Sequence, residues 1–70
     1  MDISSIQRDL ANLQKTMRDL NTKISSEKDP LKKAELRKKL AELEVKRSKL
    51  DASLEDEVTK LHSDVDLQLN

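Results

Sequence analysis

Residue types that carry out catalysis or bind metals are scarce in this 70-residue chain. His62 is its single imidazole, and cysteine is absent, so there is no thiol nucleophile, disulfide or thiolate ligand. His62 and Asp66 have the i, i+4 spacing of two metal ligands on one helix face, but two ligands do not make a site. We expect His62 to be a surface residue. The sequence predicts a protein that is not an enzyme and has no metal, cofactor or small-molecule substrate.

Basic residues are the other group that could do chemistry, because lysine and arginine bind phosphates. Residues 30–50 hold eight basic and three acidic residues, whereas residues 51–70 hold one basic and six acidic residues. This order opposes the helix dipole, so pairing of opposite charges between molecules explains it better than local stability does. A solvated charged face is the alternative. A basic patch that could bind RNA or DNA comprises Lys32, Lys33, Arg37, Lys38, Lys39, Lys46 and Lys49.

Nucleic-acid binding by a small helical regulator remains an alternative function. The formal net charge of zero and the absence of aromatic residues count against it, since bases commonly stack on aromatic side chains.

Arg47 interrupts a run of leucines, between Leu43 and Leu50, at a position where an apolar residue is expected. A charged side chain in such a seam fixes register and orientation at some loss of stability. We expect Asp9 to reach Arg47 from the neighbouring helix. The other interpretation is that Arg47 binds a carboxylate or phosphate of a partner.

The elements that position these residues follow from apolar spacing. Intervals of three and four alternate without a break through the first third of the chain, which indicates an amphipathic helix with one apolar seam. The second half has its own seam in a different phase. Together the seams predict a hairpin core of Ile3, Ile6, Leu10, Leu13, Met17, Leu20, Ile24, Leu36, Leu40, Leu43, Leu50 and Leu54.

The two phases meet at Asp29-Pro30, which is a strong helix start: Asp at the N-cap and Pro at the first helical position. We predict one domain over residues 1–70, with a helix over about 3–27, a turn at 28–29, a helix over about 30–65 and a frayed end at 66–70. The alternative is one continuous helix kinked at Pro30. Its seam would be small and interrupted: Glu27, Leu31, Ala34, Lys38, Ala41, Val45, Ser48 and Ala52.

The predicted fold class is therefore all-α, an antiparallel two-helix hairpin resembling a coiled coil. Because the second helix is longer, residues beyond Leu54 extend past the first, yet they remain striped. The predicted partner interface is Leu54, Val58, Leu61 and Val65. Seventy residues rarely form a sufficient core alone, so we expect a homodimer or larger oligomer that completes a four-helix bundle, or pairing with another helical protein.

A weaker stripe of small residues on the second helix is either an oligomer contact or a solvated face of high helix propensity: Ala34, Ala41, Val45, Ser48 and Ala52. No apolar run reaches the length of a membrane span and the first residues do not resemble a signal peptide. The expected location is the cytoplasm. The expected function is that of a non-enzymatic interaction or scaffold protein.

The second helix resembles part of the type III secretion needle subunits, through Asp29-Pro30, Ala34, Lys39-Leu40, Glu42 and Arg47. The resemblance implies a filament-forming subunit that is exported without a cleaved signal. It also implies assembly contacts around Asp29, Pro30, Lys39, Leu40 and Arg47. The chain departs from that family in having no tyrosine, and the resemblance does not cover the first helix.

Overall fold

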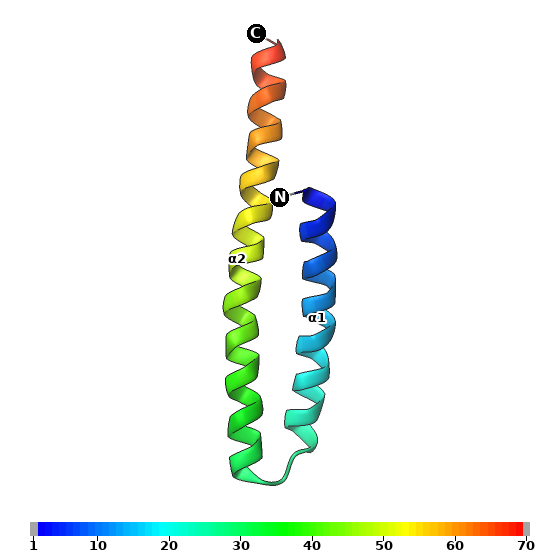
Figure 1. The fold of residues 1–70 in the computed structure, drawn as a ribbon, viewed down its shortest axis with the longest axis vertical. Coiled ribbons are helices and arrows are strands. Elements are labelled where there is room, and N and C mark those ends of the chain that lie inside the picture. The colour runs from blue at the N-terminus through cyan, green and yellow to red at the C-terminus, as the bar shows by residue number, and fades with distance from the viewer. Residues whose placement is uncertain (1, 70) are drawn as a thin grey trace.

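The chain folds as two antiparallel α-helices joined by a three-residue connection (Figure 1). The computed structural model describes the backbone of residues 2–69 and the side chains of residues 2–62. Helix α1 spans Ile3–Ser26 and helix α2 spans Pro30–Leu69. The molecule measures 61 × 15 × 15 Å, so its long dimension is the length of α2. The predicted all-α hairpin is confirmed, and the alternative of one continuous helix is wrong.

Helix α2 starts at the predicted position because Asp29 caps it. The Asp29 Oδ1 atom accepts a hydrogen bond from the backbone N–H of Leu31 at 3.0 Å, and the Asp29 carbonyl accepts one from Lys33 at 2.9 Å. Pro30 occupies the first helical position, where its missing N–H leaves no donor unsatisfied. The local sequence therefore fixes both the end of the turn and the beginning of α2.

Helix α1 ends one residue before the predicted boundary, because Glu27 leaves the helical conformation and becomes its C-cap. The Glu27 backbone N–H is shared between the carbonyls of Lys23 at 2.9 Å and Ile24 at 3.3 Å. The Glu27 side chain folds over the turn, where Oε1 accepts the backbone N–H groups of Lys28 and Asp29, each at 3.1 Å. One carboxylate thus satisfies two donors that the connection leaves outside any helix.

The other ends of the helices depend less on side chains. Asp2 is the N-cap of α1 and its carbonyl accepts the N–H of Ile6 at 3.1 Å, without a capping bond from its side chain. Helix α2 continues to Leu69, past the predicted end at residue 65 and through the segment expected to fray. No glycine occurs in the chain and no proline follows Pro30, so no residue stops the helix.

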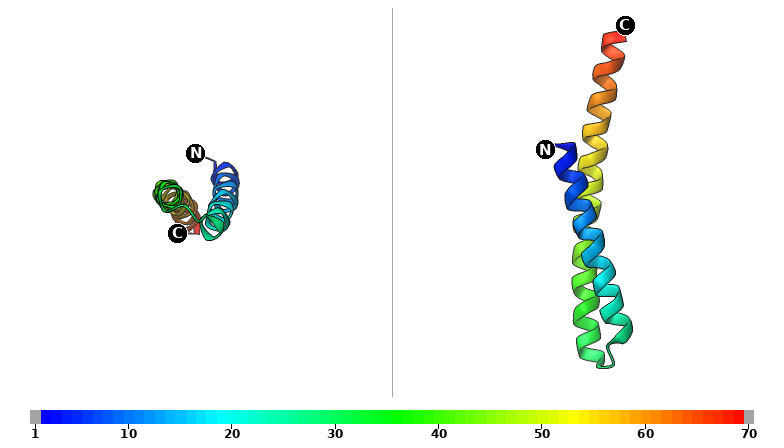
Figure 2. Two further views of the ribbon diagram at one scale, coloured as in Figure 1. Left: turned by 90° about the horizontal axis from the view of Figure 1, so that it is seen from below. Right: turned by 90° about the vertical axis from the view of Figure 1, so that its right-hand side faces the viewer.

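The core lies along the seam between the helices, which cross at a shallow angle (Figure 2). Ile6, Leu13, Met17 and Leu20 of α1 are buried. The remaining predicted core residues are half-buried: Ile3, Leu10, Ile24, Leu36, Leu40, Leu43, Leu50 and Leu54. No α2 side chain within residues 30–62 is fully buried. A single neighbouring helix therefore covers only part of the leucine seam of α2.

Candidate interaction surfaces

Helix α2 extends well beyond the N-terminal end of α1 (Figure 1). The last turns of α2 run without a neighbouring helix, because α1 ends well before α2 does (Figure 1). The apolar seam continues there: Leu54 is half-buried, while Val58 is 39% exposed and Leu61 is 53% exposed. We call Leu54, Val58 and Leu61 the overhang stripe. The side chain of Val65, the fourth residue of the predicted interface, lies outside the described residues.

Acidic residues flank the overhang stripe. Lys60 forms ion pairs with Asp56 at 3.4 Å and with Glu57 at 3.6 Å, all within α2. The negative charges of Asp56 and then Glu57 raise the pKa of Lys60 above its ordinary value. Lys60, the single basic residue of residues 51–70, is thus already paired within its own helix. The overhang presents a partner with an apolar stripe bordered mainly by carboxylates.

The structure does not bring Arg47 and Asp9 together as predicted. Arg47 Nε pairs with Asp51 Oδ2 of its own helix at 3.8 Å, and the Arg47 side chain is 47% exposed. Arg47 lies beside Gln14 and Met17 on one flank of the hairpin, whereas Asp9 lines a groove on the other flank. Arg47 is therefore level with a part of α1 that lies closer to the turn than Asp9, and the two residues line different grooves. The predicted contact within the hairpin is therefore wrong.

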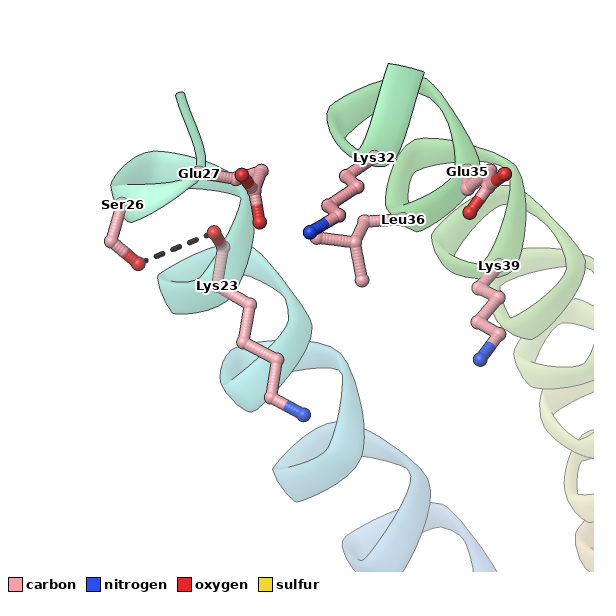
Figure 3. A pocket seen from close by; sticks show the side chains of 7 residues that line it. All are labelled: Lys23, Ser26, Glu27, Lys32, Glu35, Leu36 and Lys39. Atoms are coloured by element: carbon pink, nitrogen blue, oxygen red, sulfur yellow. Dashed lines mark hydrogen bonds between the residues drawn. The ribbon is translucent and has the colours of Figure 1, made fainter. Parts of the chain in front are cut away.

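Two shallow grooves follow the flank opposite Arg47. The groove near the turn has a volume of about 430 Å³ and is lined by Lys23, Ser26, Glu27, Lys32, Glu35, Leu36 and Lys39 (Figure 3). The second groove, of about 480 Å³, is lined by Asp9, Asn12, Leu13, Thr16, Leu43, Lys46 and Leu50. Leu36 lines the first groove, Leu43 and Leu50 line the second, and lysines border both. We call Lys23, Lys32, Lys39 and Lys46 the lysine flank.

The predicted basic patch does not form one surface. Lys32, Lys39 and Lys46 belong to the lysine flank, and Lys33 is half-buried in the seam. The helical spacing of Arg37, Lys38 and Lys49 places them on other sides of α2, where all three are exposed. Helix α2 therefore distributes its basic charge around its circumference, and only part of that charge faces the grooves.

Groups suited to catalysis or metal binding do not converge within residues 2–62. The described side chains include no cluster of three His, Cys, Asp or Glu residues, and none of their polar or charged groups is buried. His62 is exposed, and the side chain of Asp66 lies outside the described residues. None of the described helical segments is long and apolar enough to cross a membrane.

The chain matches no protein-family model, no curated protein and no solved structure in the comparisons with known proteins. The candidate interaction surfaces are therefore assigned from the geometry of the hairpin alone.

Proposed function

We propose that this protein is a non-enzymatic interaction or scaffold protein that acts by pairing its helices with those of another chain. The overhang stripe carries this proposal. Val58 and Leu61 continue the apolar spacing of Leu54 along α2, but they are more exposed than Leu54, Val58 at 39% and Leu61 at 53%. Burying such a stripe against a partner helix removes apolar surface from water, at about 25 cal/mol per Å².

The half-covered seam of α2 gives the proposal a second support. The half-buried leucines Leu36, Leu43 and Leu50 lie in grooves open to solvent. A second hairpin packed against these grooves would complete a four-helix bundle, which is the usual way for short helical hairpins to enclose a core. The partner in this proposal is a second copy or another helical protein.

The lysine flank favours a second candidate function, which is binding of RNA or DNA. Lys23, Lys32 and Lys39 border one groove, within reach of a single phosphate backbone. Glu27 and Glu35 border the same groove and would repel phosphates. This function predicts an affinity that falls steeply as salt rises and that weakens when Lys39 is replaced by Gln.

Sedimentation equilibrium across protein concentration, at low and at high salt, tests the proposed function. We expect a closed dimer or tetramer in the micromolar range. A folded monomer at every concentration would refute self-association, and a poorly helical monomer would show that pairing requires a different chain. Mass that grows without limit would favour the filament-forming alternative instead.

A further inference from the structure

A small pocket lies on the Arg47 flank of the hairpin, apart from the two grooves. It has a volume of about 240 Å³ and is lined by Gln14, Met17, Arg18 and Asn21 of α1 and by Arg47 of α2. We call these five residues the arginine pocket. Both grooves are lined in part by carboxylates, whereas no carboxylate of the described residues lines the arginine pocket. Two guanidinium groups and two carboxamides therefore share one small site.

The spacing of the α1 residues brings their side chains together on one face of that helix. Gln14 and Arg18 are four residues apart, and Arg18 and Asn21 are three apart, so they are neighbours on the helix surface. All three are exposed. Met17, which is 9% exposed, supplies the apolar part of the pocket, and Arg47 completes it from α2. The site thus exists only because the hairpin sets the two helices side by side.

The donors of the arginine pocket are largely unused within the hairpin. Arg18 forms no ion pair with any side chain of residues 2–62. Arg47 forms one, from Nε to Asp51 Oδ2 at 3.8 Å, which leaves the four N–H groups of its two Nη atoms. The carboxamides of Gln14 and Asn21 have no hydrogen-bond partner among the same described side chains. The pocket can therefore offer several donors to an acceptor from outside.

The position of Arg47 along α2 is a second, independent observation. Arg47 stands between Leu43 and Leu50, where the heptad spacing predicts an apolar residue. Its ion pair with Asp51 is exposed, and such pairs contribute little to stability. Leucine at this place would bury more apolar surface than arginine does. The fold therefore gives no reason for a guanidinium at position 47, whereas binding of an anion does.

We propose that the arginine pocket binds a phosphate group, either inorganic phosphate or a small phosphate monoester. Guanidinium donates pairs of parallel hydrogen bonds that match phosphate oxygens. A phosphate monoester carries a charge of about −1.5 to −2 at pH 7 and has three strong acceptor oxygens, enough for both arginines and a carboxamide. A carboxylate has one charge and two oxygens, which a single arginine satisfies. The donor set of the pocket therefore fits phosphate better.

Titration of the full chain with sodium phosphate, followed by nuclear magnetic resonance at constant ionic strength, tests this site. We expect saturable shifts of the side-chain N–H signals of Gln14, Arg18, Asn21 and Arg47. The dissociation constant should lie in the millimolar range, because the pocket is open to water. Shifts that grow linearly and spread over the exposed lysines would show screening by salt and would overturn the inference. The site is independent of helix pairing through the overhang stripe or the grooves, so either proposal can fail alone.

Two further probes identify the source of the phosphate group. Phenyl phosphate that binds more tightly than inorganic phosphate and shifts the Met17 methyl signal would assign the pocket to an organic monoester. Equal affinities would assign it to the free ion. If neither probe moves the Arg18 and Arg47 signals while a short DNA duplex shifts those of the lysine flank, the inference is overturned. The second candidate function would then be favoured.

Matched variants separate the arginine pocket from positive charge in general. Arg47→Leu and Arg18→Leu should each weaken phosphate binding about tenfold or more, since each removes charge-assisted hydrogen bonds. Arg8→Leu removes the same group from an exposed position of α1 outside the pocket and should leave the affinity unchanged. Equal losses in the Arg8 and Arg47 variants would overturn the inference. Circular dichroism checks that each variant keeps its helix content.

Discussion

Glu27 and Asp29 form a chain of side-chain caps across the turn. Glu27 Oε1 accepts the backbone N–H of Asp29 at 3.1 Å, and Asp29 Oδ1 accepts the N–H of Leu31 at 3.0 Å. The first carboxylate holds the backbone of the connection and the second caps the start of α2. Because the connection contains no glycine and all its residues have negative φ, these bonds hold a turn that ordinary residues can adopt.

Replacing Glu27 by Ala should lower the free energy of unfolding by about 1 kcal/mol, because the N–H groups of Lys28 and Asp29 lose their acceptor. Urea denaturation followed by circular dichroism at one protein concentration measures this change. Glu27→Gln is the matched control, since its amide oxygen retains an acceptor at the same place. If the Ala and Gln variants are equally stable, the Glu27 side chain does not hold the turn.

Replacing Asp29 by Ala should lower the free energy of unfolding by about 1 kcal/mol, the usual loss for an N-cap. The physical reason is the loss of the bond from the Leu31 N–H to Asp29 Oδ1. Thermal and urea unfolding measure it, with Asp29→Ser as a control that keeps a capping oxygen. A Ser variant as unstable as the Ala variant would contradict a capping role.

The sequence was sufficient for the hairpin but not for every contact within it. Asp29-Pro30 and the change of heptad phase predicted the break correctly, because both features act locally. The role of Glu27 was missed, since Glu27 falls on the seam spacing of α1, where a charged residue looks like an interruption. A charged residue at a seam position, directly before Asp29-Pro30, was the sequence feature that could have predicted a role for Glu27 in the turn.

The predicted pairing of Arg47 with Asp9 failed for a geometric reason. The heptads predicted Arg47 to lie level with Leu10, next to Asp9, whereas the structure places Arg47 beside Gln14 and Met17, closer to the turn. They did not give the side of the seam on which each residue lies, and the structure places them on opposite flanks. Two side chains on neighbouring helices can pair only if they match both in height along the hairpin and in the side of the seam on which they lie.

Replacing Arg47 by Leu should raise the free energy of unfolding by about 1 kcal/mol. The substitution restores an apolar residue between the half-buried Leu43 and Leu50. It removes only an exposed ion pair with Asp51, and such pairs contribute about 0.5 kcal/mol at most. Lys15→Leu, on an exposed face of α1, is the control for a general gain in apolar content. An Arg47→Leu variant no more stable than the Lys15→Leu variant would show that position 47 does not belong to the seam.

Replacing Leu61 by Asp should weaken assembly through the overhang stripe by about tenfold or more, while the hairpin keeps its helix content. Leu61 is 53% exposed and lies beyond the end of α1, so its loss does not disturb the core. Sedimentation equilibrium measures the effect. Thr59→Asp, on the same segment but outside the stripe, is the control of equal charge. If the Leu61 variant stays fully oligomeric at low micromolar concentration, the overhang is not the contact.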